Sequence, residues 1–385
     1  MARNGIFFGI LLALIALLQP WSATAASPDD KKPSLLKTPS EACQSCHKAI
    51  HQQWQKSAHG QPRTLTPLYQ ALAQSETTCP QCHLPKSEDK EIFKGDGALP
   101  CVTCHTIESV AHGGKSNNAK TMGIALYQLN EKVIQGPNGA WFGAKGAVPP
   151  GSIDEELASN PFFHHANPEV FRTTTACLGC HDPQKLNDAK TYPVSCQSCH
   201  MPVSGGFADH GTPAGKSPRM VKRGTVLSLQ AKQNGKELTI QVTMTNLLPH
   251  PFPNGGPFSM GLLRLTLLDA RGETLWENIE KQNMDKDPKA VFALTTADDL
   301  GHPAPPKPMT TIPAKDSRLK SGETRSVNYK MQQPSVAVVR AELIVLPLAP
   351  GWLEKLPENQ RELPKGLLAA KSEVKLPDGT GGANH

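Results

Sequence analysis

Cys43-Gln-Ser-Cys-His47 is the first of five Cys-x-x-Cys-His motifs in this chain of 385 residues. The other four are Cys79–His83, Cys101–His105, Cys177–His181 and Cys196–His200. They use all ten cysteines, which are Cys43, Cys46, Cys79, Cys82, Cys101, Cys104, Cys177, Cys180, Cys196 and Cys199. In a helical turn two cysteines at this spacing share one face, so both sulfurs can reach one porphyrin edge and the histidine can face the iron. The pattern is that of c-type haem attachment, and it predicts five covalently bound haem c groups.

Other uses of paired cysteines do not account for the histidines. Ten cysteines in an exported protein could form five disulfides, and Cys-x-x-Cys pairs also occur in zinc ribbons and redox dithiols. None of these sites requires a histidine directly after the second cysteine. Histidine makes up 14 of the 385 residues, so its presence after all five pairs by chance has a probability of roughly one in ten million. The pattern therefore favours haem attachment.

Residues 1–26 have the parts of a secretory signal peptide. A positive start with Arg3 precedes the apolar run Ile6–Leu18, and small residues follow at Ala23–Ala26. The apolar run is short for a membrane span, although an uncleaved N-terminal anchor is the alternative. No later segment approaches membrane length, so we expect no integral span after cleavage. We expect an exported protein, periplasmic, at the cell surface or extracellular, which agrees with haem attachment outside the cytoplasm.

Residues 27–220 contain all five motifs, with about 39 residues for each expected haem. Apolar runs are short and prolines frequent in this part, so a side-chain core of ordinary size cannot form. We expect a multihaem cytochrome c domain of short helices and loops around five haems, with the porphyrins as most of its interior. Motifs two and three start 22 residues apart and motifs four and five 19 residues apart, which predicts that these haems are neighbours.

After residue 220 the pattern becomes that of β-strands. Apolar and polar residues alternate within Leu238–Met244, Leu263–Leu267, Val327–Met331 and Ala337–Val345. A period of two predicts antiparallel strands with one buried face. About seven strands in residues 221–349 favour an immunoglobulin-like antiparallel β-sandwich. The composition of residues 350–385 predicts an extended, partly disordered tail. The predicted fold class of the whole chain is α+β.

Each haem iron has two axial positions to fill. The motif histidines His47, His83, His105, His181 and His200 are the expected proximal ligands. Nine histidines remain for the distal side, and methionine is the other common distal ligand. Met201 directly follows a motif histidine and cannot reach the iron of its own motif, while the other methionines lie mostly in predicted strands. The sequence therefore favours two histidines at every iron.

Several stretches resemble the multihaem c-type cytochromes related to the tetrahaem electron carrier of ammonia-oxidising bacteria. The first motif, followed by Trp54 and then Ser57-Ala-His59, is similar to the opening of that family. The resemblance implies that His59 is a distal ligand of another haem and that Trp54 packs against a porphyrin. His112, shortly after the third motif, resembles a trailing histidine that reaches a distant iron in the family.

The resemblance continues through the later motifs and into the β-strands. His164-His165 ahead of the fourth motif is similar to a ligand histidine of longer members, which implies that one of the two binds an iron. His210 after the fifth motif is similarly placed. Asn246–Gly255 resembles a loop by which relatives with a C-terminal β-domain present a histidine, here His250, to a haem. Pro249 stands where that loop has glycine.

The remaining histidines have plainer interpretations. His51 lies four residues after His47, on the same helical face, and is interpreted as a hydrogen-bond partner. His302 and His385 are interpreted as exposed residues. The distal candidates are therefore His59, His112, His164, His165, His210 and His250.

An iron with two histidine ligands has no open coordination site for a substrate, so the first hypothesis is electron transfer between redox protein partners. The sequence does not identify these partners. A multihaem oxidoreductase with one five-coordinate haem, acting on a small nitrogen or sulfur compound, is the second, so an enzymatic activity is left open. A subunit of a cytochrome filament is the third. The formal net charge is +6, and its Lys and Arg residues are scattered, so we expect no nucleic acid partner.

Overall fold

The computed structural model describes sixteen segments of the chain, and the statements below concern these residues. They are 34–61, 68, 82, 98–111, 123–137, 162–182, 186, 194–214, 217–254, 256, 258–279, 284–297, 300, 312–354, 356–361 and 365–377. The expected signal peptide, Cys79, His83, His112, His302 and His385 lie outside them. The described residues from Leu35 onward belong to one compact unit. No helix in the described residues is long and apolar enough to cross a membrane.

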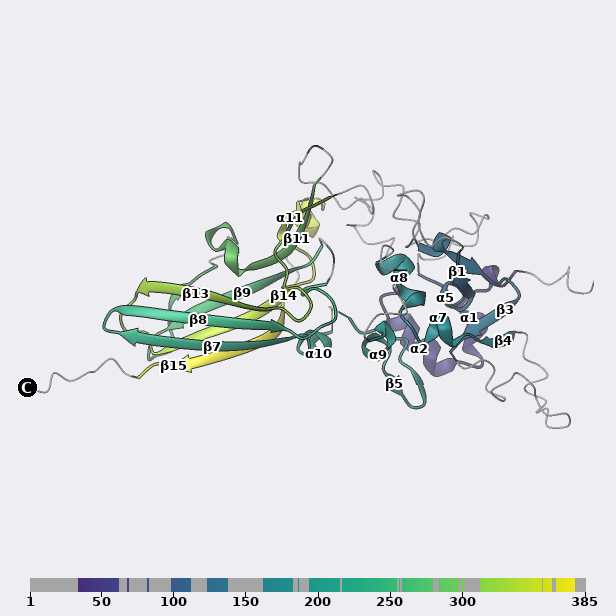
Figure 1. Ribbon diagram of the computed structural model, residues 1–385, viewed down its shortest axis with the longest axis horizontal. Helices are drawn as coiled ribbons and strands as arrows, with labels where there is room; N and C mark the ends of the chain where they lie inside the picture. Colours follow the sequence, from purple (N-terminus) through teal and green to yellow (C-terminus); the bar gives the residue numbers. More distant parts are fainter. Residues whose placement is uncertain are drawn as a thin grey trace, which may run out of the picture. The chain divides into compact units, whose positions relative to one another are not determined.

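The motif-bearing part consists of short helices and very short strands (Figure 1). Its helices are η2 Leu35–Lys37, α1 Glu41–Gln44, α2 Lys48–Lys56, α5 Cys101–His105, η4 Gly123–Leu126, α7 Pro168–Phe171, α8 Thr175–His181 and α9 Cys196–His200. Its strands are β1 Ile107–Val110, β2 Tyr127–Leu129, β3 Val133–Gly136, β4 Phe163–Ala166, β5 Val203–Ser204 and β6 Phe207–Ala208. The pairs β1–β2 and β5–β6 are antiparallel, and β3–β4 is parallel.

This part has a small side-chain core in its described residues. The buried apolar side chains that cluster there are Ile107, Leu126, Tyr127, Val170, Leu178 and Leu186. Six side chains are too few to hold so many short elements by burial alone, because an isolated helix of one or two turns is unstable in water. The small core agrees with the expectation that porphyrins supply most of the interior.

The second part is built from antiparallel strands. They are β7 Thr225–Asn234, β8 Glu237–Asn246, β9 Met260–Leu268, β10 Thr274–Glu277, β11 Val291–Ala297, β12 Ile312–Asp316, β13 Thr324–Gln332, β14 Val338–Leu346 and β15 Leu367–Lys375. Short helices flank or connect them: α10 Pro218–Val221, η6 Met284–Lys286, η7 Pro288–Ala290, α11 Pro350–Leu353 and η8 Glu358–Gln360. One sheet has the order β12-β11-β9-β14-β15 with β10 beside β9. The other sheet has the order β13-β8-β7 (Figure 1).

The two sheets share one core. Strand β8 buries Leu238, Ile240, Val242 and Met244, and these side chains belong to the same buried cluster as Leu263, Leu265 and Leu267 of β9 and Leu343 of β14. Four strand segments predicted from alternation are thus confirmed in β8, β9, β13 and β14. Every residue of β9 except Arg264 is buried, so both faces of this strand are covered. The α+β fold class is confirmed.

The prediction of an extended tail after residue 350 is wrong for its middle part. Strand β15 pairs with β14 over its length and forms an edge of the larger sheet. The segment Leu367-Leu-Ala-Ala370 supplies apolar side chains that pack against the core, with Ala369 buried. Lys371, Glu373 and Lys375 then alternate on the solvent side, which suits an edge strand. The charged composition reflects that edge position and not disorder.

Candidate haem-binding site

The described motifs place their cysteines and histidines on single helical turns. Helices α5 and α9 each begin at the first cysteine of a motif and end at its histidine. Pro100 and Ser195, the residues before them, have extended backbone conformations that start each turn sharply. Helix α8 contains the whole fourth motif, and His47 of the first motif is the N-cap of α2. Of the second motif only Cys82 is described.

Four motif histidines each face one of the distal candidates. The ring centres are 6.1 Å apart for His47 and His164, 6.0 Å for His59 and His181, 6.2 Å for His105 and His210, and 6.4 Å for His200 and His250. A metal ion bonded to a nitrogen of both rings at about 2 Å would hold the ring centres roughly 6 Å apart. Each pair therefore leaves the space that one haem iron needs. His83 and His112 lie outside the described residues, so their relation is untested.

Contacts between cysteines indicate which motifs are neighbours. Cys43 lies close enough to Cys101, and Cys177 close enough to Cys196, for each neighbour to raise the pKa of the thiol. The Cys82 thiol lies 3.9 Å from the carbonyl oxygen of Cys180. Motifs four and five are neighbours, as their spacing predicts. Motif one is also beside motif three, and motif two beside motif four, which the intervals in the sequence do not reveal.

Comparison with known proteins agrees with this geometry. No protein-family model matches the chain, and no curated protein matches it. The chain is similar to the crystal structure of a penta-heme cytochrome c552 from Thermochromatium tepidum, with 32% sequence identity and a TM-score of 0.74, over 89% of this chain and 100% of that chain. The chain belongs to the multihaem c-type cytochromes.

Hydrogen bonds fix which ring nitrogen of this multihaem cytochrome can bind a metal. The Nδ1 atoms of His105 and His200 lie 2.7 Å from the carbonyl oxygens of Gln135 and Pro213. The Nδ1 atoms of His164, His210 and His250 lie 3.1, 2.8 and 3.0 Å from the carbonyl oxygens of Phe162, Ala208 and Pro251. A carbonyl oxygen only accepts, so Nδ1 carries the hydrogen and Nε2 keeps its lone pair. Nε2 is therefore the nitrogen available to an iron.

Burial favours the neutral, metal-binding form of four of these histidines, His105, His164, His210 and His250. Burial lowers the pKa of His105 to about 4. The hydrogen bond to the Gln135 carbonyl partly opposes this shift. The nearby histidines His210, His164 and His47 add to it. Burial likewise lowers the pKa of His164, His210 and His250. Since a metal ligand must be an unprotonated nitrogen, no proton has to be removed from them at neutral pH.

The structure distinguishes the two adjacent histidines of β4. His164 faces His47, whereas the exposed His165 lies 3.4 Å from the side-chain oxygen of Gln135 through its Nδ1. Successive residues of a strand point to opposite sides, so only one of the two can face a given haem. The sequence left this choice open.

Tyr127, which no pattern in the sequence singles out, holds the fourth motif in place. Its hydroxyl donates to the carbonyl of Thr175 at 2.6 Å and accepts from the backbone N–H of Gly179 at 2.7 Å. A Cβ atom on Gly179 would lie 2.4 Å from the Tyr127 ring, so glycine within Cys177-Leu-Gly-Cys180 permits this close approach. In the sequence, this contact is signalled only by Gly179 itself, because glycine lowers helix propensity and is unexpected inside a helical motif.

Asn246 holds the loop that carries His250. This asparagine is fully buried, and its side-chain amide donates to the carbonyl oxygens of His250 at 2.9 Å, Lys320 at 2.9 Å and Leu319 at 3.1 Å. Its side-chain oxygen accepts from the backbone N–H of Leu248 at 3.0 Å. One side chain thus ties both ends of the turn to the neighbouring loop.

Asn246→Ala is expected to loosen the His250 loop. The free energy of unfolding of the β part should fall by about 1–3 kcal/mol because buried carbonyl groups lose their donor. Part of one low-spin haem signal should become high-spin in the EPR spectrum. Thr243→Ala, which removes a hydroxyl from the exposed Thr243–Ser326 pair of the same sheet, is the control. An unchanged spectrum and unchanged denaturation curve for Asn246→Ala would contradict this role.

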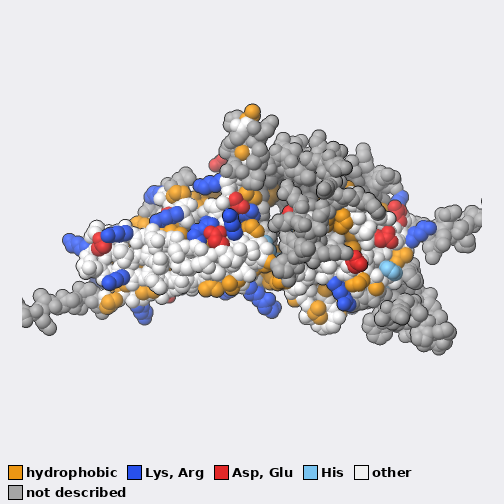
Figure 2. Space-filling view, in the orientation of Figure 1, with side chains coloured by type: hydrophobic (Ala, Val, Ile, Leu, Met, Phe, Trp, Pro, Cys, Tyr) orange, Lys and Arg blue, Asp and Glu red, His pale blue; other side chains and the backbone are white. Residues whose placement is uncertain are grey.

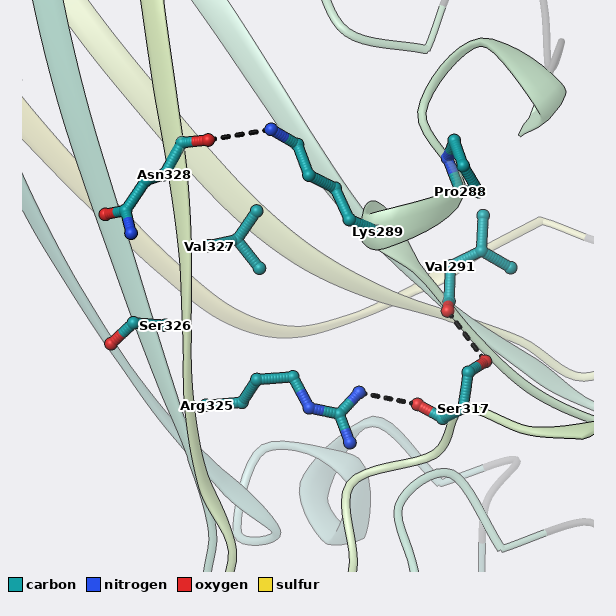
Figure 3. A pocket seen from close by; sticks show the side chains of 8 residues that line it. All are labelled: Pro288, Lys289, Val291, Ser317, Arg325, Ser326, Val327 and Asn328. Carbon is teal, nitrogen blue, oxygen red and sulfur yellow. Dashed lines mark hydrogen bonds between the residues drawn. The ribbon is translucent and has the colours of Figure 1, made fainter.

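The β part also has a shallow pocket of about 300 Å³ between η7, β11 and β13. Lys289 donates to the carbonyl oxygen of Asn328 at 2.7 Å, and Arg325 donates to that of Ser317 at 2.7 Å (Figure 3). The Ser317 hydroxyl donates to the carbonyl of Val291 at 2.9 Å. Both cations are bonded to backbone groups of opposite walls, so they brace the two sheets. This pocket contains none of the expected haem ligands.

One face of the β part can be followed in the space-filling view (Figure 2). On the face drawn in Figure 2, Lys and Arg side chains are spread among uncharged residues. Nucleic acid binding would need these cations gathered on one element. The face in view has no such stripe.

Proposed function

We propose that this multihaem cytochrome is an exported electron carrier whose five haems are each held between two histidines. The observation that carries the proposal is the set of four facing histidine pairs, each with its ring centres 6.0 to 6.4 Å apart. With both axial positions filled, an iron has no site for a substrate, which favours electron transfer over catalysis. The predicted signal peptide supports a location in the periplasm or at the cell surface.

The residues of the chain hold, orient and space the redox groups. When bound, the haems supply one-electron chemistry. The paired imidazoles are stronger donors than a methionine thioether and should lower the reduction potentials relative to cytochromes with methionine and histidine. The cysteine contacts support two runs of neighbouring haems, one through motifs one and three and the other through motifs two, four and five.

Two finer points belong to the same proposal. We infer that the family tie extends to the tetrahaem carrier of ammonia oxidisers, on the Trp54 and Ser57-Ala-His59 stretch after the first motif. We also infer an immunoglobulin-like arrangement for the β part, since two antiparallel sheets enclose one core.

The mass of the mature protein is expected to exceed that of the chain from Ser27 by five haems, roughly 3 kDa in total. Each complete motif supplies two sulfurs for covalent attachment, so the haems should remain bound after denaturation. Intact-protein mass spectrometry measures the difference. A fully matured sample that lacks one haem would contradict the count.

The oxidised protein is expected to show only low-spin ferric signals of two kinds in EPR. The ring planes are tilted by 59° for His47 and His164 and by 69° for His59 and His181. They are close to parallel, at 20° and 25°, for His105 with His210 and for His200 with His250. Tilted axial imidazoles give strongly anisotropic low-spin spectra, whereas near-parallel ones give ordinary rhombic spectra. Quantified EPR should find at least two haems of each kind.

The same spectrum separates a carrier from an enzyme. A high-spin ferric signal of about one-fifth of the haem would leave one iron five-coordinate and favour the oxidoreductase hypothesis. His83 and His112 lie outside the described residues, so the second motif is where such a haem would be sought.

A further inference from the structure

His51 is a buried imidazole that the haem-ligand pairs do not use. It lies on α2, four residues after His47, and only 2% of its surface is exposed. Neither of its ring nitrogens has a hydrogen-bond partner among the residues that the structure describes. Its role as a hydrogen-bond partner, expected from the sequence, therefore needs a group other than these residues.

The lack of a partner has an energetic consequence. A buried polar group without a hydrogen bond costs about 1–3 kcal/mol, so native structures rarely keep one. The Trp54 ring lies beside His51, with ring centres 5.3 Å apart, but the Trp54 Nε1–H already donates to the carbonyl oxygen of Leu99 at 2.9 Å. The folded cytochrome must supply His51 with a different polar neighbour.

The surroundings of His51 belong to the first and third motifs. Helix α2 begins directly after His47 of the first motif. Leu99, just before the third motif, bonds to α2 through Trp54 and donates its backbone N–H to the carbonyl oxygen of His59 at 2.8 Å. Cys101 donates its backbone N–H to the Ser40 hydroxyl at 3.1 Å. His51 therefore lies on the helix that directly follows the first motif and that contacts Leu99, two residues before the third motif, through Trp54.

We propose that His51 donates a ring N–H to a propionate carboxylate of the haem at the first or the third motif. The inference rests on the proposed function, since it takes haems at both motifs as given. The propionates are the hydrogen-bonding groups of the haem periphery, and a carboxylate is a strong acceptor. His51 is thereby a positioning residue that compensates part of the propionate charge.

This hydrogen bond raises the reduction potential of that haem. An uncompensated propionate near the iron favours the ferric state, because the ferric centre carries one more positive charge. A donor to the carboxylate reduces that preference. Removing the donor without changing the volume should therefore make the haem harder to reduce, while both axial histidines stay in place.

The test is a potentiometric titration of the matured protein followed by EPR, with wild type, His51→Phe and His51→Gln. In His51→Phe, one low-spin signal should show a ferric-to-ferrous ratio about three- to tenfold higher at fixed potential, tenfold being about 59 mV. His51→Gln keeps a donor and should titrate close to wild type. A shift in a strongly anisotropic signal assigns the propionate to the first motif, and a shift in a rhombic signal assigns it to the third.

Three results would overturn the proposal. One is an unchanged titration in His51→Phe with all five haems attached, and another is an equal shift in both variants. The third is conversion of a low-spin signal to high-spin, which would make His51 an axial ligand. If the phenylalanine variant does not mature, the bond can be tested by infrared difference spectra of the wild type with carboxyl-labelled haem. Propionate bands without a hydrogen bond at the haems of the first and third motifs would refute the proposal. Failure of the proposed function would appear instead as high-spin haem or missing mass in the wild type.

Discussion

His250→Ala is expected to turn one low-spin haem into a high-spin haem while all five haems stay covalently attached. His250 faces the motif histidine His200 with ring centres 6.4 Å apart, and the alanine side chain cannot reach an iron between them. The cysteines of the fifth motif are unchanged, so the intact mass should differ only by the substitution. The high-spin signal should account for about one-fifth of the total haem.

The same substitution should open a binding site and raise a reduction potential. The reduced variant should bind carbon monoxide at one iron, which the wild type should not. The potential of that haem should rise, because loss of a strong imidazole donor destabilises the ferric state. The signal that disappears should be rhombic, since the planes of His200 and His250 differ by 25°.

His165→Ala is the matched control for this experiment. His165 is a distal candidate by sequence, but it is exposed and lies beside Gln135, whereas its neighbour His164 faces His47. The control should keep every low-spin signal. If His250→Ala also leaves the spectrum unchanged, the loop around His250 is an ordinary turn, and the β part would serve as a docking module.

The covalent sites could be predicted from the sequence because their chemistry is local. Five residues of one helical turn contain both sulfurs and the proximal histidine, so each motif is complete in itself. Distal partners are different, because they come from distant segments. Nothing in the spacing shows that His59 faces His181 or that His105 faces His210, which lie over 100 residues apart. The sequence could supply the set of candidates but not the pairing.

The β part shows the same limit of local patterns. Alternating segments predicted four strands, because each buries one face in a shared core. Strand β15 escaped prediction, since its Lys371, Glu373 and Lys375 resemble a solvated tail until the neighbouring β14 is known. The roles of Tyr127 and Gln135 could not be predicted from the sequence for a related reason. Their roles depend on hydrogen bonds to Gly179 and His105, which no periodic pattern encodes.

Expressed without haem attachment, the chain is expected to fold only in its β part. The motif-bearing part has a cluster of six buried apolar side chains among its described residues, whereas the cluster shared by the two sheets has 27. Burial of apolar side chains is the main favourable term in folding, so the β part has a core of its own. The short motif helices have no comparable source of stability without the porphyrins.

Limited proteolysis with mass spectrometry measures this difference directly. In a host that cannot attach haem c, fragments from the region before Thr225 should be digested, and a fragment containing β7 to β15 should persist. Thermal unfolding of the haem-free chain should show one transition. Below its midpoint temperature, far-ultraviolet circular dichroism should show the signal of β-strands. The matured protein, treated with the same protease, is the control and should be protected in both parts. Protection of the motif-bearing part in the haem-free chain would mean that its side chains alone form a sufficient core.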